Sequence, residues 1–322
     1  MYNLNINIVS PVQKYGQKPL LKLYYFMRSY FCFNRILAGV IALLLIATIF
    51  FACTKNGSDA APSNANDNLS ISAAGNEATV SSVYNDLFSV VAEVSINMGL
   101  SETGRIAKNN QSGKLGYCYT PTADDMTIDH WPKVLTVDFG TGCPDVSGRS
   151  RAGILKLTYT GYFRYPGATV TVEPITYTVN GVKLTGTDLI TNLSTNDVYK
   201  YSAEVKGGTI QIDTITISYG SKFTITQTAG AGTTEGDDAT SDDVYTFTGS
   251  DALTYPDGNI ATATISDSAA LVRKFDCPYI GKGKVALTFK SVITTIDYGN
   301  GVCDDSVLVS IGDKVKNVAL PK

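Results

Sequence analysis

Two short stretches of the chain combine residue types that could carry chemistry. Residues 137–145 read VDFGTGCPD and residues 296–305 read IDYGNGVCDD, so each contains an aspartate, an aromatic residue, two glycines and a cysteine in the same order. Carboxylates beside a glycine-rich turn can bind a calcium ion, with loop carbonyls as further ligands. The weak calcium candidates in these stretches are Asp138, Asp145, Asp297, Asp304 and Asp305.

A structural role for the two stretches is favoured over a metal or nucleotide site. Neither has the dense alternation of aspartates that an EF-hand loop needs. Neither leads into a helix whose N-terminus could hold a phosphate. Glycines with positive φ would instead make a tight turn at the end of a strand. We therefore expect two strand-end turns, and the sequence predicts no cofactor.

An arginine pair follows the first stretch. GRSRAG, residues 148–153, places Arg149 and Arg151 on one face if the segment is a strand. Two guanidinium groups on one face can recognise an anionic ligand or pair with nearby carboxylates. Pairing with Asp138 or Asp145 is the favoured interpretation.

The only histidine and the only tryptophan stand together in DHWP, residues 129–132. A catalytic triad that needs histidine would have to use His130, but no Gly-x-Ser-x-Gly motif accompanies it. No pair of glutamates is singled out for glycoside hydrolysis either. We expect a turn with Trp131 packed under it, and the sequence predicts no catalytic residue and no enzyme.

The N-terminal region has the pattern of a bacterial lipoprotein signal. Residues 36–52 form an uncharged apolar run after Arg28 and Arg35, and Ala52 stands directly before Cys53. A retained transmembrane helix is the alternative, but the run is short for a span of about 20 residues. We expect Cys53 to be lipidated and to become the first residue of the mature protein.

This processing divides the chain into four parts. Met27 begins a signal of ordinary length, so the residues before it are interpreted as upstream sequence that is not part of the protein. The polar stretch after Cys53 is rich in Ser, Asn, Ala and Gly, which is typical of a flexible tether. The predicted parts are an extension at 1–26, a signal peptide at 27–52, a tether at 53–77 and a helix plus antiparallel β domain at 78–322.

Charge limits the partners of the mature protein. The first 52 residues hold five basic and no acidic residues, which leaves 21 basic and 29 acidic residues and a net charge of −8. An acidic exported domain is a poor partner for nucleic acid. A lipid anchor instead attaches it to a membrane, with the folded part in water. We expect an outer-membrane lipoprotein of the cell envelope.

Cysteine spacing indicates how the two glycine-rich turns are held. Four cysteines follow Cys53, and an even number in an exported chain favours disulfides. Three pairings are open to four cysteines; the similar spacing favours Cys118 with Cys143 and Cys277 with Cys303. Zinc is disfavoured because the chain has no CxxC pair and only one histidine.

One helix and many strands are expected in the mature chain. Residues 78–96 carry apolar side chains at helical spacing, which predicts an amphipathic helix. From about residue 115, short Thr-, Val-, Ile- and Tyr-rich runs alternate with turn signals at Asn180-Gly181, Gly207-Gly208 and residues 257–259. The pattern predicts a mostly β fold, an antiparallel multi-stranded sheet arranged as a meander, sandwich or barrel, preceded by the helix.

Three segments together resemble a family of uncharacterised Bacteroidota lipoproteins. The segments are DFGTGC followed by GRSRAG, then VNGVKLTGT, then DYGNGVCD near the end. The resemblance implies the same architecture and location, and it implies no mechanism. We expect a non-enzymatic structural, adhesive or ligand-binding role, with another envelope protein as one kind of partner. A carbohydrate-binding or glycan-processing role is the alternative.

Overall fold

The computed structural model shows one long helix and a large antiparallel sheet. The residues that it describes are 65–101, 118–144, 148–195, 198–212, 214–232 and 242–321, without the side chain of Cys143. Cys53 and the predicted signal lie outside this part of the chain. No helix among the described residues combines the length and the apolar character needed to cross a membrane.

The helix, α2, spans Ala65–Asn97. The negative charge of Asp67 in the first turn stabilises the helix through its dipole. Gly99, with a φ of 67°, ends the helix, and the Leu100 N–H donates to the Ser95 carbonyl at 2.7 Å. The helix therefore begins well before residue 78, and residues 65–77, which were predicted as tether, belong to it.

Seventeen strands are described. Their bounds are β1 Thr120–Ala123, β2 Lys133–Asp138, β3 Cys143–Pro144, β4 Ser150–Ala152, β5 Ile154–Tyr159, β6 Thr169–Pro174, β7 Thr178–Val179, β8 Val182–Asn192, β9 Lys200–Ile212, β10 Ile215–Ala229, β11 Val244–Thr254, β12 Ile260–Ile265, β13 Leu271–Lys274, β14 Lys282–Phe289, β15 Val292–Asn300, β16 Ser306–Ile311 and β17 Lys314–Ala319. One short 3₁₀ helix, η1, spans Asp267–Ala269.

The strands form a long meander in which all pairings are antiparallel. The main order is β1-β2-β5-β6-β8-β9-β10-β11-β12-β14-β15-β16-β17. The short strands β3, β4 and β7 add a ladder beside β8, and β13 joins β11 to β14. The fold-class prediction is confirmed, and the meander is the arrangement found.

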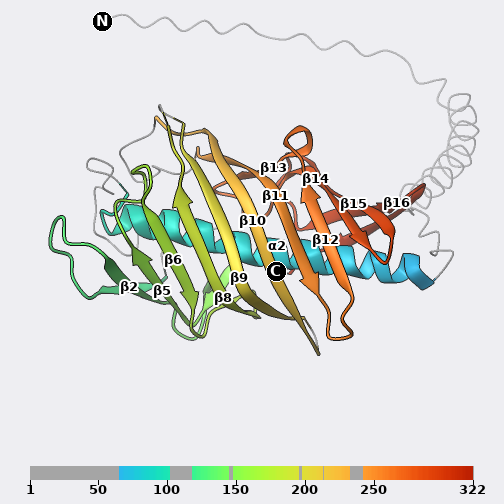
Figure 1. Cartoon of the computed structure of the whole chain (residues 1–322), viewed down its shortest axis with the longest axis horizontal. Helices are drawn as coiled ribbons and strands as arrows, with labels where there is room; N and C mark the ends of the chain where they lie inside the picture. The colour runs from blue at the N-terminus through green and yellow to red at the C-terminus, as the bar shows by residue number, and fades with distance from the viewer. Residues whose placement is uncertain are drawn as a thin grey trace, which may run out of the picture. The chain divides into compact units, whose positions relative to one another are not determined.

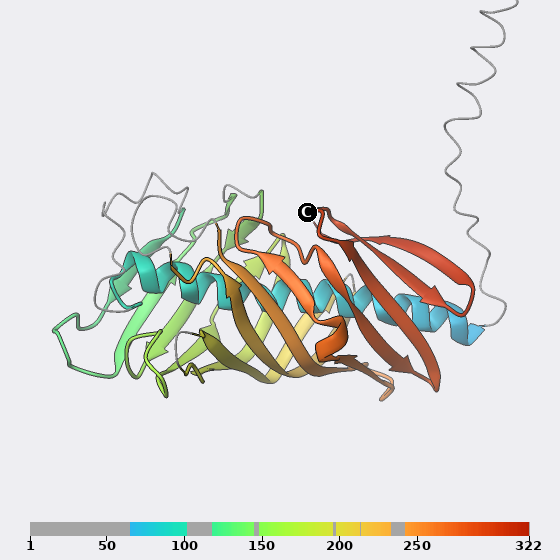
Figure 2. The same ribbon diagram turned by 90° about the horizontal axis from the view of Figure 1, so that it is seen from above.

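The sheet curves around the helix (Figures 1 and 2), and α2 runs along its inner face with the strands crossing it. Every residue from 83 to 96 is buried, including those on the side of the helix away from the predicted apolar stripe. The helix is therefore the centre of the core rather than an amphipathic helix on its surface. Its polar side chains must find partners inside the protein because water cannot reach them.

In β5, inward and outward side chains alternate, and the inward ones contribute to the core. Leu155, Leu157 and Tyr159 of β5 are buried on the inner face. The strand ends at Tyr159, so the alternation does not continue through Tyr165, which is 44% exposed in the following loop.

Two of the three turn predictions are confirmed, and the third is wrong. Asn180 and Gly181 join β7 to β8 with φ of 51° and 77°, and residues 257–259 join β11 to β12. Gly207 and Gly208 instead lie inside β9, where the register with β10 shifts. A Cβ at Gly208 would lie 2.7 Å from the Tyr84 hydroxyl, so glycine here admits a side chain of the helix.

Candidate functional site

The first glycine-rich stretch forms a turn, as predicted, whereas the second continues strand β15 as far as Asn300 and bends only at Gly301. Gly140 has a φ of 63° and Gly299 a φ of 88°. The N–H groups of these glycines donate to the carboxylates of Asp138 and Asp297 at 2.7 and 2.9 Å. Each aspartate thus accepts from the backbone N–H two residues ahead, which is a structural use of the carboxylate.

The weak calcium candidates do not assemble into a metal site where they are described. Asp304 accepts from the Ser306 N–H at 3.1 Å, and Asp297 also pairs with Lys284 at 2.8 Å. No group of three or more His, Cys, Asp or Glu side chains in the described ranges is placed to hold a metal ion. Asp145 lies outside these ranges, and Asp305 is half-buried directly before β16.

The predicted pairing of Cys277 with Cys303 is present. Their sulfurs are bonded, with the Cα atoms 5.9 Å apart, and the bond ties the second glycine-rich stretch to the segment after β13. Cys118 is also in a disulfide. The side chain of Cys143 is outside the described part of the chain, so the pairing of Cys118 with Cys143 stays a prediction.

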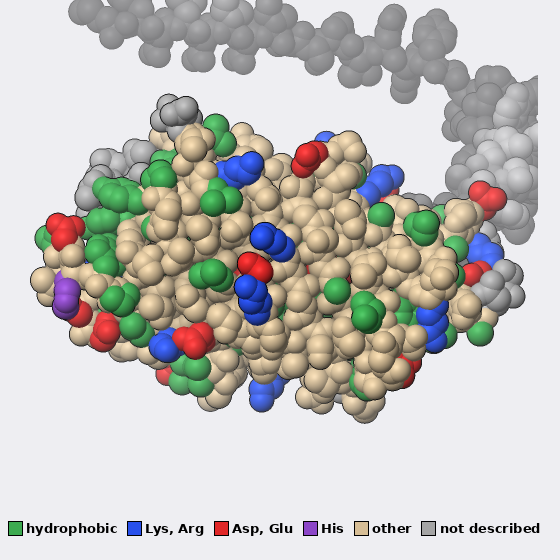
Figure 3. Space-filling view, viewed as in Figure 1, with side chains coloured by type: hydrophobic (Ala, Val, Ile, Leu, Met, Phe, Trp, Pro, Cys, Tyr) green, Lys and Arg blue, Asp and Glu red, His purple; other side chains and the backbone are tan. Residues whose placement is uncertain are grey.

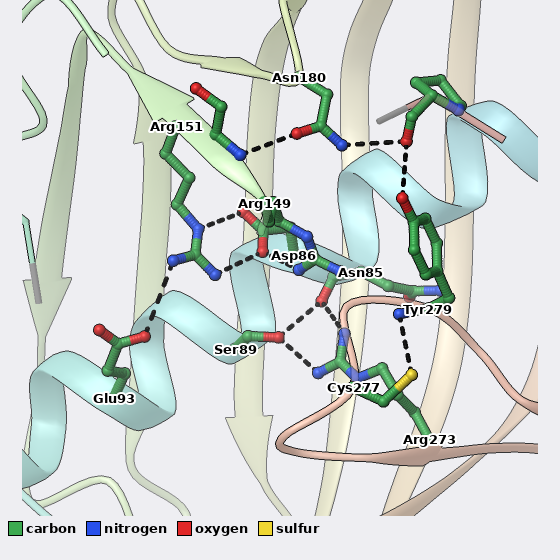
Figure 4. A network of polar contacts seen from close by, with 12 residues as sticks. Asn85, Asp86, Ser89, Glu93, Arg149, Arg151, Asn180, Arg273, Cys277 and Tyr279 are labelled. Carbon is green, nitrogen blue, oxygen red and sulfur yellow. Dashed lines mark hydrogen bonds and ion pairs between the residues drawn. The ribbon is translucent and has the colours of Figure 1, made fainter. Parts of the chain in front are cut away.

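A buried ionic network fixes the helix inside the sheet (Figure 4). Asp86 lies at its centre, with no exposure, and accepts two hydrogen bonds from Arg151 at 2.9 Å, one from the Tyr177 hydroxyl at 2.6 Å and one from Arg149. Burial alone would raise the pKa of Asp86, but the two arginine charges and the hydrogen bonds lower it well below its ordinary value. Asp86 is therefore ionised in the core.

The arginines come from the sheet beside the first glycine-rich turn. Arg151 is in β4 and Arg149 directly precedes it, and both face inward with 4% exposure. Arg151 also lies 3.9 Å from Glu93, two helical turns after Asp86. The described partner of both arginines is thus a helix residue, and the predicted partner Asp138 is engaged in its own turn.

A third arginine joins the network from the other half of the sheet. Arg273 of β13 donates to the Asn85 carbonyl at 3.2 Å and to the Ser89 hydroxyl (Figure 4). Burial and the positive charge of Arg149 lower the pKa of Arg273 to about 9. Residues 85–89 of the helix therefore bond both to β4 and to β13, and the network attaches the helix to two distant parts of the sheet.

The end of the chain is tied to the same region. The Pro321 carbonyl accepts from the Asn180 amide at 3.1 Å and from the Tyr279 hydroxyl at 3.2 Å (Figure 4). A hollow of about 610 Å³ opens beside this junction, with Thr79 of the helix, Lys183 and Pro321 among its lining residues.

Sequence patterns did not identify Asp86 as the centre of the network. Asp86 and Arg151 are 65 residues apart, so no local motif contains both. The available signal was the pair Asp86 and Glu93, seven residues apart in the helix. Such spacing puts two acids on one helix face. Arg149 and Arg151 share one face of a strand in the same way, so the two acids and the two arginines could have been paired with each other.

A set of loops at one end of the sheet exposes aromatic and apolar side chains. Connections β1–β2, β5–β6 and β8–β9 share this end because alternate turns of a meander lie on the same side. The Gly167 N–H bonds to the Asn192 carbonyl at 2.9 Å, which joins the second loop to the base of the third. We call this surface the aromatic rim; its exposed members are Met126, Ile128, Tyr165, Leu193 and Val198, and its partly buried aromatic members are Trp131, Tyr162 and Tyr199.

Three rings form a cluster on the rim. Trp131 lies 5.2 Å from Tyr162 between ring centroids, and Tyr162 lies 5.1 Å from Tyr165. The turn predicted at DHWP is present, and Trp131 packs partly against the core. His130 contacts Asp125 in the same loop and is largely exposed. Figure 3 shows hydrophobic side chains gathered at the end of the domain that carries the histidine.

No protein-family model matches the chain, and no match was found among curated proteins or solved structures.

Proposed function

We propose that the protein is an exported lipoprotein, anchored to a membrane through Cys53, whose β domain acts without catalysis as a structural, adhesive or ligand-binding body. The observation that carries the proposal is the Cys277–Cys303 disulfide. Disulfides persist in oxidising compartments outside the cytosol. The apolar run at 36–52, which precedes Cys53, supports the same destination.

Fatty-acid labelling tests the anchor. The full chain is expressed in a bacterium that processes lipoproteins, and cells are grown with an alkyne-tagged fatty acid. We expect the protein to be labelled, and we expect Cys53→Ala to abolish the label. Cys32→Ala is the matched control, because this cysteine belongs to the predicted signal and its loss leaves the label in place. Absence of label on the unaltered chain would refute the proposed anchor.

The interior supports a non-enzymatic role because its ionic groups are used by one another. Asp86, Arg149 and Arg151 are buried and bonded within the helix–sheet network, where they hold the fold together. A glycan or protein partner would therefore meet the outer surface. Functional contacts commonly lie on loops that a rigid scaffold positions, and the aromatic rim consists of such loops.

Carbohydrate binding is the second candidate, favoured by the ring cluster. Trp131, Tyr162 and Tyr165 offer apolar ring surface beside the polar pair His130 and Asp125. Aromatic side chains combine a broad apolar face with a polar edge, which suits the alternating apolar and hydroxyl faces of a sugar.

A polysaccharide array tests this candidate. The purified domain is compared with Tyr165→Ala, which removes an exposed ring with little effect on folding. The control is Ile293→Ala, which trims a 69% exposed side chain on β15, a strand that carries none of the rim residues. We expect a glycan signal that Tyr165→Ala weakens at least tenfold and Ile293→Ala leaves unchanged. Equal loss in both variants, or no signal on any glycan, would exclude carbohydrate binding at the rim.

A further inference from the structure

A second polar cluster lies in the core, separate from the arginine network. Glu77 of α2 is fully buried and Asp251 of β11 is 5% exposed. None of their four carboxylate oxygens has a donor from another group among the described residues, and the two carboxyl groups lie close enough to hydrogen-bond to each other when one is protonated. The hydroxyl of Tyr298 is buried nearby and has no partner there, and the buried hydroxyl of Tyr219 has only the Ser221 side chain beside it. Buried polar atoms are nearly always satisfied in folded proteins, so this cluster needs a partner.

Three parts of the fold bring these oxygens together. Asp251 is directly opposite Ser221 in the β10–β11 register, and Tyr219 is two residues away on the same inner face of β10. Tyr298 projects inward from β15, a strand that packs against α2. Glu77 is on the helix between them, within electrostatic range of Asp251, Tyr219 and Tyr298.

The charge of this cluster is uncompensated by protein cations. Burial, followed by the charge of Asp251, raises the pKa of Glu77 well above its ordinary value. Burial likewise raises the pKa of Asp251 to about 7. The groups that face the pair are the phenols of Tyr219, Tyr298 and Tyr255, and no arginine or lysine among the described residues shifts either carboxyl. This environment is the opposite of that around Asp86, where two arginines supply the counter-charge.

We propose that Glu77 and Asp251, with the hydroxyls of Tyr219 and Tyr298, form a binding site for a calcium ion. Two carboxylates supply two negative charges, which a divalent cation neutralises. The donor set is oxygen only, which hard cations prefer, and Ca²⁺ accepts carboxylates in varied geometry. Mg²⁺ fits less well because it retains waters in a strict octahedron. The ion would link the helix to β11 and β15.

A proton shared by the two carboxyl groups is the competing account. Paired carboxyls in an apolar site can hold one proton between them, and they then titrate as a unit. The two accounts differ in what they predict above pH 7. A shared proton leaves the protein indifferent to calcium, whereas a calcium site gains occupancy as the carboxyls lose protons.

Refolding with and without calcium distinguishes the accounts. Because the site is enclosed, the mature chain is unfolded in urea and refolded at pH 8 with CaCl₂ or with EDTA. We expect one calcium ion per chain by elemental analysis after desalting, and a higher melting temperature in calcium than in EDTA. No bound calcium, with equal melting temperatures at pH 8, would overturn the proposal and favour the shared proton.

Variants locate the site. Asp251→Asn is expected to weaken calcium binding at least tenfold, and Tyr298→Phe, which removes only a hydroxyl, is expected to weaken it less while folding normally. Asp297→Asn is the matched control, because this aspartate is a calcium candidate in the second glycine-rich stretch, in β15, where it pairs with Lys284 near the surface. If Asp297→Asn abolishes binding and Tyr298→Phe has no effect, calcium is held by the second glycine-rich stretch and the interior site is refuted.

Discussion

Replacing Asp86 with asparagine should destabilise the domain more than any surface charge change. The substitution keeps the shape of the side chain and removes its charge. Arg149 and Arg151, each 4% exposed, would then be left as buried cations without their shared counter-charge. The Tyr177 hydroxyl would also lose a charged acceptor that lies 2.6 Å away.

The magnitude follows from burial. Removing one partner of a buried ion pair costs about 3–5 kcal/mol, because the remaining charge stays desolvated. Asp86 serves two arginines, so we expect about 4 kcal/mol, a large share of the roughly 5–15 kcal/mol that stabilises a domain. For a domain of this size the melting temperature should fall by about 10 °C.

Urea unfolding at pH 7, followed by tryptophan fluorescence and circular dichroism, measures the effect. Glu173→Gln is the matched control: its carboxylate lies 2.9 Å from the Lys156 amine, but both side chains are substantially exposed. An exposed pair contributes about 0–1 kcal/mol. If Asp86→Asn costs no more than Glu173→Gln, the network does not hold the helix in the sheet and the reasoning fails.

Three further predictions follow from single features. Replacing Cys277 and Cys303 together with serine should cost about 3 kcal/mol in urea unfolding, and reductant should then have a smaller effect than on the unaltered domain. Gly153→Ala should lower the free energy of unfolding by about 3 kcal/mol or more, since φ is +82° and the new Cβ would lie 2.2 Å from the Thr176 carbonyl oxygen. Gly181→Ala, with a φ of +77° and open space around the new Cβ, should lower it by only about 1 kcal/mol. Equal losses of stability in the two variants would contradict this reasoning. Burial raises the pKa of Asp188 from 3.8 to about 7, so its contribution to stability is present below pH 4 and is lost as pH rises through 7. The free energy of unfolding of Asp188→Asn should equal that of the unaltered domain at pH 4 and exceed it by up to about 4 kcal/mol at pH 8. A difference in stability that stays constant between pH 4 and pH 8 would refute this prediction.

Local patterns were sufficient for the strands and for most turns. The alternation in β5 reflects one face on the core and one in water, and the Asn180-Gly181 pair reflects the positive φ that a two-residue hairpin needs. The spacing of Cys277 and Cys303 was informative because both cysteines flank one small part of the sheet.

The enclosure of the helix could not be predicted from local patterns. Its apolar stripe is compatible with a surface helix, and only the wrapping of the sheet makes the other side of the helix interior. The Gly207-Gly208 pair has the local pattern of a turn. Gly208 is needed for another reason, because any side chain there would collide with the hydroxyl of Tyr84, which is far away in the sequence. Arg149 was matched to nearby acids for the same reason, since Asp86 is 63 residues distant.

Intact-mass spectrometry of the protein isolated from its native envelope tests the central claim most directly. The account predicts a polypeptide that begins at Cys53, carries the added mass of acyl chains, and gains the mass of four hydrogens when its two predicted disulfides are reduced. A mass that includes residues 27–52, or one that begins at Cys53 without acyl chains, would contradict the proposed lipoprotein.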